Sequence, residues 1–511
     1  MTLEAIHLPE PLLAFAHGQS LEGPKDGLFL FGPVEDASGR NQVRIGIIGT
    51  PEGVGLARLW LRRLSGFILG KTDKSGNPVS WAPSWPGFAE CFGVSLPLQG
   101  TAELKLDRVA VEAAIKKGNR ADAVRSTVIM FAAAIRNHVR TEERQPDLWL
   151  VVVPDVVFRY GRPQVGLPPK AERTRSTIIS AKAAKRALIG GDLFPEIVDE
   201  AETYLFSSNF HHQLKAELLQ DKIALQLALE STLEDRAITN AKAERRRGLL
   251  DEATVAWNFA TTLYFKMDAK PWALAEVRPG VCYVGLVFKK NPSPTAAGET
   301  CCAAQMFLNS GDGLVFRGAL GPWYSDKTRE YHLSLKAAKS LMISVVNGYK
   351  AKHGRYPVQL FIHGRHTFNV DEWRGFASAV TDETQLIGVR IQSQDDMRLF
   401  RPQASTPVLR GTAILVTKRT GLLWTLGYVP RLASYQGFET PKPLSVEVTH
   451  GDVDLKQVLA DVLALTKLNY NACDFASGLP VTLKFADRVG EILMASPRTV
   501  SAPPLPFRFY I

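Results

Sequence analysis

The sequence predicts an α/β protein with more than one domain, and three observations lead to this prediction. A strand at residues 43–49 is followed by a glycine-containing turn and a helix at 56–64, which is the order that opens an α/β unit. The apolar run at 148–153 is typical of a parallel strand buried on both faces. Beyond about residue 276, the predicted strands form hairpins, which indicates a second domain of a different type.

In the first half of the chain, residues 1–40 read as short turns and strands, with a strand at 28–31. After the 43–49 strand, Gly53 and Gly55 predict a tight turn, but they do not fit the GxGxxG pattern of a dinucleotide site. One long helix is predicted over 108–140 because apolar residues gather on one side and basic residues on the other. A basic helical stretch near 182–186 follows the buried strand.

In the second half, we expect a strand at 281–288 and a hairpin of 302–308 with 314–316. A helix at 334–353 leads into a buried strand at 358–363. Further strands are predicted at 412–417 and 422–428, and a final helix begins near Leu483. The domain boundary is placed within 271–276.

Composition and charge narrow the function classes. The chain has 511 residues, 45% of them hydrophobic and 22% charged, which excludes global disorder. No uncharged apolar run approaches the roughly 18 residues of a membrane span, and the acidic N-terminus does not resemble a signal peptide. Five cysteines without a metal or disulfide spacing favour the reducing cytoplasm. The net charge of +10 favours a polyanionic partner such as nucleic acid.

Polar residues in the middle of the chain could bind a phosphate. His211 and Lys215 are four residues apart, so on a helix they share a face, and a helix start adds free N–H groups. Gln226 lies on a segment that reads equally well as helix or buried strand. Lys266 ends a predicted helix, where an exposed lysine is also common. The alternative interpretation of these residues is a solvated polar face.

Two features near the end of the chain complete the candidates. The last residues are apolar and aromatic, which predicts that Ile511 is buried and that its terminal carboxylate either binds a ligand or merely packs. Asp487 lies on the final helix. One carboxylate does not make a two-metal phosphodiesterase site, which needs several converging acids.

Taken together, these residues resemble the short prokaryotic Argonautes, which consist of a MID domain and a PIWI domain. The resemblance covers almost the whole chain, and its most specific blocks are Leu465-Thr466-Lys467-Leu468-Asn469-Tyr470-Asn471 and Leu479-Pro480-Val481-Thr482-Leu483. It implies a Rossmann-like MID domain followed by an RNase H-like PIWI domain. The predicted division is an N-terminal segment at 1–40, the MID domain at 41–275 and the PIWI domain at 276–511.

The resemblance also implies roles for individual residues. In the family, the MID pocket holds the 5′-phosphate of a guide strand, and His211, Lys215, Gln226 and Lys266 stand at the matching places, with Gln226 at the turn into a strand. A Mg²⁺ ion bridges the guide phosphates to the terminal carboxylate, here that of Ile511. In members that cut, four acidic residues hold two metals. Here Val287 or a neighbour and the Gly364-Arg365-His366 run replace two of them, and Asp487 is the remnant.

The resemblance therefore implies a recognition subunit rather than an enzyme. We expect it to bind a 5′-phosphorylated guide RNA and a complementary single-stranded DNA target. A partner protein with an APAZ region would carry the effector, which is a TIR or SIR2 NADase or, less often, a nuclease. Together they would form a prokaryotic immune system that acts by abortive infection. The alternatives are a guide-directed endonuclease of the RNase H type and a basic structural protein that binds nucleic acid without a guide.

Overall fold

The structure of the full chain is a computed structural model. The residues that the structure describes are 3–37, 39, 42–176, 178–190, 195–234, 251–276, 278–290, 300–308, 313–400, 402–435, 439–497 and 504–511. The predicted boundary at residues 40 and 41 lies outside the described residues, as do residues 309–312 between the strands of the predicted hairpin.

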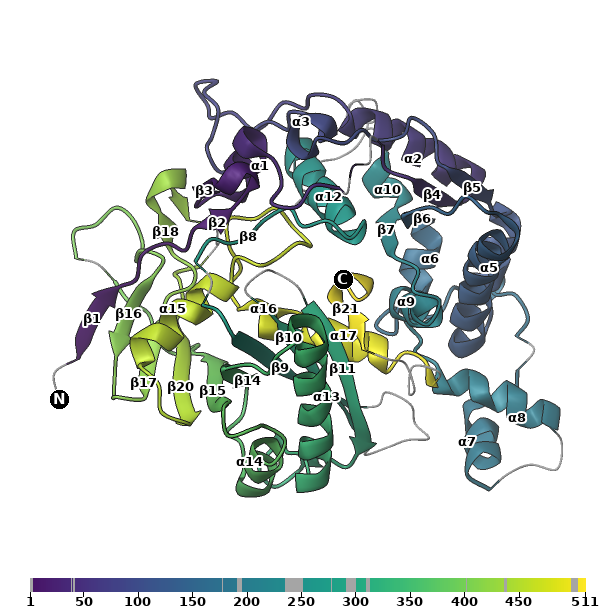
Figure 1. Ribbon diagram of the computed structural model, residues 1–511. Helices are drawn as coiled ribbons and strands as arrows, with labels where there is room; N and C mark the ends of the chain where they lie inside the picture. Colours follow the sequence, from purple (N-terminus) through teal and green to yellow (C-terminus); the bar gives the residue numbers. More distant parts are fainter. Residues whose placement is uncertain are drawn as a thin grey trace.

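The first half of the chain forms a small parallel sheet with helices on its faces (Figure 1). Its strand order is β5-β4-β6-β7, and each neighbouring pair is parallel. The strands are β4 (Ile45–Gly49), β5 (Ala102–Lys105), β6 (Leu148–Val153) and β7 (Leu225–Leu229). Every residue of β4 and β6 is buried, as their apolar sequences predict for strands covered on both faces.

The helices around this sheet include α2 (Pro51–Leu64), α5 (Arg120–Thr141), α9 (Phe210–Leu219) and α12 (Glu252–Lys266). The predicted turn at Gly53 and Gly55 is wrong, because both residues lie in the first turns of α2. Thr50 is the N-cap and accepts a hydrogen bond from Gly53 N at 3.0 Å, and Pro51 occupies the first helical position. These capping signals start the helix five residues earlier than expected.

Two further predictions about local structure are wrong for similar reasons. The long helix at 108–140 is two helices, α4 (Arg108–Ile115) and α5, because Asn119 caps a new helix start. The predicted strand at 28–31 belongs to helix α1 (Pro24–Phe31), which begins with a proline at its first position. The basic stretch near 182–186 is helical, as α7 (Ala181–Gly190), and is paired with α8 (Pro195–Glu202).

The second half of the chain is built on a ten-stranded mixed sheet. Its order is β1-β16-β17-β20-β15-β14-β9-β10-β11-β21, and β9, β14 and β15 are mutually parallel. The central strands are β9 (Val281–Lys290), β10 (Thr300–Phe307), β11 (Gly313–Gly321), β14 (Gln359–Gly364) and β15 (Gln385–Ser393). The flanking strands are β16 (Thr412–Leu415), β17 (Thr420–Leu423), β20 (Leu444–His450) and β21 (Leu505–Pro506). The predicted hairpin is the antiparallel pair β10 and β11.

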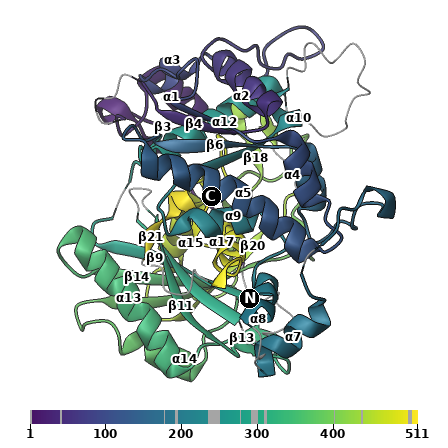
Figure 2. The same cartoon turned by 90° about the vertical axis from the view of Figure 1, so that its right-hand side faces the viewer.

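Helices cover both faces of this large sheet (Figures 1 and 2). One face packs on α13 (Leu335–His353) and α14 (Val370–Ala377) in a hydrophobic cluster that includes Leu286 and Leu360. The other face packs on α15 (Leu455–Leu465), α16 (Val481–Lys484) and α17 (Ala486–Leu493). At Gly285, a Cβ atom would lie 1.9 Å from Thr482 O, so glycine allows α16 to approach β9 closely.

The two ends of the chain are tied into the second half. Strand β1 (Glu4–His7) pairs with β16 at the edge of the large sheet. Glu10 accepts hydrogen bonds from Arg410 Nε at 2.8 Å and Lys467 Nζ at 2.6 Å. Burial raises the pKa of Glu10, but these two cations outweigh it and lower that pKa. In both views the C-terminal end lies in the middle of the molecule, between the two sheets (Figures 1 and 2).

Within the described parts of the chain, we find no helix that combines the length and the apolar character needed to cross a membrane.

Candidate phosphate-binding site

The sequence-predicted phosphate residues come from three elements that meet beside the C-terminal end of the chain. His211 and Lys215 lie on α9, Gln226 on β7 and Lys266 at the end of α12. Gln226 is in a strand, which agrees with the position implied by the resemblance and not with a continued helix. Asn209 caps α9 by accepting a hydrogen bond from His212 N at 3.3 Å, so the helix begins just before His211.

Lys215 is directed at the C-terminal end of the chain. Its side chain is buried, and Nζ donates a hydrogen bond to the main-chain oxygen of Ile511 at 2.5 Å. A second, longer contact joins Nζ to Tyr510 O at 3.5 Å. Burial, and after it Arg488, lowers the pKa of Lys215 to about 7. Ile511 is itself only 3% exposed, so the predicted burial of the tail is observed.

Lys266 is also buried. The alternative interpretation, in which it is an exposed lysine at the end of a helix, is therefore wrong. Its Nζ donates to Gln226 Oε1 at 2.9 Å and to Leu225 O at 2.7 Å. Burial lowers the pKa of Lys266 well below its usual value, and the nearby Lys215 and Arg488 lower it further. When an anion restores its charge, the ammonium group of Lys266 has three donors, so one N–H is then left for that ligand.

The His211 side chain is accessible to solvent at the first turn of α9. Neighbouring protein atoms nevertheless displace part of the water around the imidazole, and this desolvation lowers its pKa well below the ordinary value. Lys215, His212, Lys266 and Arg488 add to that lowering, in this order. Groups that destabilise one another's positive charge in this way form an electropositive site for an anion.

Arg488 on α17 is a member of this cluster that the sequence analysis missed. It contributes to the lowered pKa of His211, Lys215 and Lys266, which places its charge close to all three. Its side chain is exposed, and among the described residues it has no hydrogen bond or ion pair that would neutralise it. The sequence analysis identified its neighbour Asp487. The basic residue directly after Asp487 was the signal that could have indicated Arg488.

A cavity of about 220 Å³ lies next to His211. Its lining is mostly apolar and comes from β6, α6 (Asp155–Tyr160), α9 and β7. Phe158 and Arg162 stand at this cavity, with the guanidinium 3.9 Å from the ring centroid. An apolar cavity beside a cationic cluster suits a ligand that has both a phosphate and a flat, weakly polar group.

Asp487 lies apart from the phosphate residues, in a second pocket at the ends of β9 and β14. Leu286 and Phe288 line this pocket, whereas Val287 is buried in the core against α17. The β9 side chain that comes near Asp487 is that of Lys289, whose Nζ lies 3.9 Å from Oδ1. Across the described ranges, no group of three or more His, Cys, Asp or Glu side chains is arranged to hold a metal ion.

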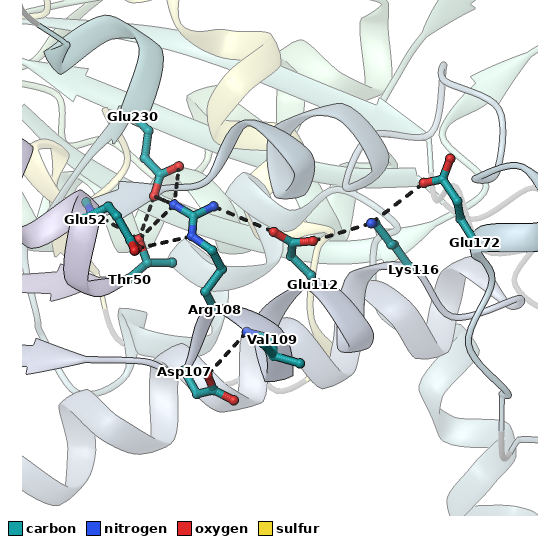
Figure 3. Close-up of polar contacts among 10 residues, drawn as sticks. Thr50, Glu52, Asp107, Arg108, Val109, Glu112, Lys116, Glu172 and Glu230 are labelled. Carbon is teal, nitrogen blue, oxygen red and sulfur yellow. Dashed lines mark hydrogen bonds and ion pairs between the residues drawn. The ribbon is translucent and has the colours of Figure 1, made fainter.

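The ends of β4 and β7 in the small sheet, where parallel sheets often bind ligands, are occupied by a side-chain network (Figure 3). Arg108 Nη2 donates to Glu230 Oε1 at 3.0 Å and to Thr50 Oγ1 at 3.3 Å, and Thr50 Oγ1 donates to Glu230 at 2.7 Å. Arg108 Nε also donates to Glu52 at 3.1 Å. These contacts join α2, α4 and the end of β7, and we assign them a structural role.

Comparisons with known proteins identify the fold. No protein-family model and no curated protein sequence matches the chain. Among solved structures, Clostridium butyricum Argonaute bound to a guide DNA and a 19-mer target DNA matches with a TM-score of 0.62 and 15% identity. The match covers 100% of this chain and 55% of that one. A. aeolicus Argonaute matches with a TM-score of 0.54 and 14% identity, over 97% of this chain and 53% of that one. Drosophila Piwi matches with a TM-score of 0.54 and 12% identity, over 99% and 56%.

The chain thus has the fold of the part of Argonaute that it covers, and it spans about half the length of these proteins. The predicted fold class, a Rossmann-like MID domain followed by an RNase H-like PIWI domain, is confirmed. The resemblance to Argonautes is confirmed at the level of fold.

Proposed function

We propose that this protein is a guide-dependent nucleic-acid recognition subunit. It binds a 5′-phosphorylated guide RNA and, through base pairing, a complementary single-stranded DNA target. Among proteins of the same fold, Clostridium butyricum Argonaute has been solved with a guide DNA and a target DNA. The small sheet would carry the guide end, and the large sheet would support the paired strands.

The observation that carries this proposal is the convergence of four basic side chains near Lys215, whose ammonium group contacts Ile511. His211, Lys215, Lys266 and Arg488 come from three helices of the chain. Keeping the two buried lysines close together is costly, and their lowered pKa values express that cost. A terminal phosphate, with nearly two negative charges, offsets it through several charge-assisted hydrogen bonds.

The apolar cavity beside His211 would take the first nucleobase of the guide. A terminal phosphate and its base are joined through one sugar, so the two binding regions must be neighbours, as this cavity and His211 are. The cavity is lined mainly by carbon atoms, which favours stacking and shape over hydrogen-bond readout.

Mg²⁺ is part of the proposal, and the terminal carboxylate of Ile511 would help to hold it at the guide end. The chain offers Ile511 as an oxygen ligand, already within hydrogen-bond reach of Lys215. Mg²⁺ usually takes one or two protein carboxylates and fills its shell with phosphate oxygens and water, so this donor set fits the ion. The ion would supply positive charge next to the phosphates, while Lys215 orients the terminal group.

The effector chemistry is proposed to reside in a partner chain with an APAZ region, a TIR or SIR2 NADase or, less often, a nuclease. In this view the chain does not cut its target, and the immune response of the cytoplasmic complex is abortive infection. A bound duplex that persists would keep the partner active, because a ligand shifts an equilibrium only while it is bound.

The proposal is tested by measuring guide affinity with fluorescent 20-nucleotide RNA and DNA strands that have either a 5′-phosphate or a 5′-hydroxyl. We expect the 5′-phosphorylated RNA to bind most tightly and a complementary DNA to join it only when the guide is loaded. Complementary and scrambled targets are compared in Mg²⁺ and in Mn²⁺, and their lengths are read on a denaturing gel.

Equal affinity for both 5′ ends would contradict the guide-binding function. Cleavage of the complementary target, lost on Asp487→Ala, would instead support the guide-directed endonuclease.

A further inference from the structure

A cavity of about 360 Å³ lies between α2, the start of α12 and the short helix α10 (Glu230–Leu233). In Figure 1, α2 and α10 lie at the upper edge of the molecule, away from the large sheet. Lys266, at the other end of α12, is about 20 Å from Glu252 along the helix axis, given a rise of about 1.5 Å per residue. The cavity is therefore separate from the phosphate cluster.

The walls of this cavity are mainly apolar. Leu59 and Trp60 from α2, Leu233 from α10 and Val255 from α12 line it. Leu59 is exposed on the outer side of α2, and Phe67, shortly after that helix, is exposed as well. Exposed apolar side chains that gather around a cavity are typical of a binding site, whereas single exposed ones are ordinary.

Polar contacts hold the walls of the cavity in place. Glu230, at the start of α10, accepts hydrogen bonds from Thr50 Oγ1 at 2.7 Å and from Arg108 Nη2 at 3.0 Å. Arg63 Nε of α2 donates to Glu252 Oε1 of α12 at 2.6 Å. Since these contacts join α10 and α12 to α2, the cavity is formed before any ligand enters it, which reduces the cost of binding.

Trp60 has a buried hydrogen-bond donor without an acceptor. Trp60 is only 6% exposed, and its ring packs edge-on against Phe259 of α12, with centroids 6.1 Å apart. Among the described residues, Trp60 Nε1 has no hydrogen-bond partner. A buried donor of this kind is unusual, because it has lost its water without compensation. Since Trp60 also lines the cavity, a ligand with an acceptor atom would supply the missing partner.

The charged groups of the lining favour a ligand with a negative charge. Across the part of the chain that the structure describes, Arg62 has no hydrogen bond or ion pair, whereas Arg63 is paired with Glu252. Glu234 also lines the cavity, but it is exposed to solvent, which screens its charge. A guanidinium and an indole N–H are together suitable donors for one carboxylate group.

We propose that this cavity binds an apolar carboxylate. The carboxylate oxygens accept hydrogen bonds from Trp60 Nε1 and Arg62, and the hydrocarbon part lies against Leu59, Leu233 and Val255. A free fatty-acid-like carboxylate and the C-terminal residue of another polypeptide share this chemistry. Binding here is independent of the proposed guide recognition, because the phosphate cluster contributes none of the described lining residues.

The test is isothermal titration of the full chain with decanoate and, as a probe of opposite charge, decylamine at pH 7. We expect decanoate to bind at least tenfold more tightly. Trp60→Phe keeps an aromatic ring but removes the donor, and it should weaken decanoate binding about fivefold. Arg62→Gln should weaken it about tenfold or more, and Arg140→Gln, at an exposed position on α5, is the matched control and should change it less than twofold.

Two further measurements separate a bound ligand from a general effect on folding. Val255→Trp fills the cavity without touching its polar groups, so it should abolish decanoate binding while guide loading stays normal. In a chain with ¹⁵N-labelled indoles, the signal that is missing in Trp60→Phe should move downfield when decanoate binds, because its N–H gains an acceptor. A signal that does not move would overturn the assignment of Trp60 as a donor to the ligand.

The source of the carboxylate is identified with a short uncharged peptide that ends in two leucines and has either a free or an amidated C-terminus. Tighter binding of the free-ended peptide than of decanoate would identify a polypeptide end, and the reverse order a small carboxylate. Equal binding of decanoate and decylamine, or decanoate affinity unchanged in both Trp60→Phe and Arg62→Gln, would overturn the proposal. Residues 235–250, after Glu234, lie outside the described residues. A tenfold gain in decanoate affinity on changing Leu249 and Leu250 to Ser would mean that the chain itself fills the cavity, which would also overturn it.

Discussion

The sharpest test of the 5′-phosphate site is the removal of the Lys215 charge without removal of its bulk. Lys215→Met keeps a buried aliphatic side chain at this position of α9 and removes only the ammonium group. In the structure that group donates to Ile511 O at 2.5 Å and makes a long contact to Tyr510 O at 3.5 Å. One good donor is therefore committed to the chain, and the others are available to a guide phosphate.

The expected loss follows from this donor count. A hydrogen bond between charged groups contributes about 1.5–3 kcal/mol, so losing one such bond should weaken guide binding by about tenfold to about 150-fold. Adding His211→Ala removes a second donor from the same helix face and should bring the total to about 3–6 kcal/mol, or roughly two to four orders of magnitude. The retained stem limits the cavity, so the thermal midpoint should change little.

The assay is the ratio of affinities for guides with a 5′-phosphate and a 5′-hydroxyl. Structural damage would weaken both guides equally and leave the ratio unchanged, whereas loss of a phosphate contact lowers the ratio. Lys339→Met, at an exposed position on α13, is the matched control and should preserve the wild-type ratio. A ratio that survives both Lys215→Met and the double variant would refute the assignment of this cluster to the guide phosphate.

Four further predictions concern the tail, pH and the partner. Residues added after Ile511 should lower 5′-phosphorylated guide affinity by about tenfold and abolish its Mg²⁺ dependence, and unchanged values would mean that the tail only packs. Guide affinity should decrease as pH rises from 6 to 8.5, because burial lowers the pKa of His211 and Lys266 and a bound phosphate restores their protons; a flat profile would contradict this. Burial lowers the pKa of His363 from 6.5 to about 3, so the unfolded state binds a proton below pH 6.5 that the folded state does not, and stability falls on acidification. This linkage should lower the free energy of unfolding by about 2 kcal/mol between pH 8 and pH 5. Denaturant unfolding should show that this pH-dependent loss is absent in His363→Gln. Output of the reconstituted effector should require guide and target together and persist in Asp487→Ala, and output with guide alone would contradict the sensor role.

The parts of the fold that could be predicted are those whose signal is local. The apolar runs of β6 and β9 predicted buried strands because both faces of those strands are covered by helices. The start of α2 was missed because glycines were given more weight than the cap at Thr50 and the proline that follows it. The break between α4 and α5 was missed because the amphipathic pattern continues across it, and only the side chain of Asn119 ends one helix and starts another.

Prediction of the candidate site required information about residues that are far apart in the sequence. Spacing alone placed His211 and Lys215 on one helix face, but it gave no reason to bring Lys266 to them. That contact exists because the end of α12 packs on β7, where Lys266 reaches the side chain of Gln226 at 2.9 Å. Resemblance supplied what periodicity could not, namely the expectation that these separate segments meet at one site. It did not supply Arg488, because the pattern transferred from the family did not include it.

The geometry of α17 explains why neighbouring residues serve different sites. Successive residues on a helix point about 100° apart, so Asp487 and Arg488 are directed to different parts of the surroundings. Helix α17 packs on both α9 and β9. Asp487 therefore reaches Arg365 in the large-sheet pocket, while the charge of Arg488 acts on Lys215 and Lys266 beside α9. The sequence pattern around a single acidic residue could point to Asp487 but not to Arg488. The direction of each side chain depends on packing partners that are far away in the sequence.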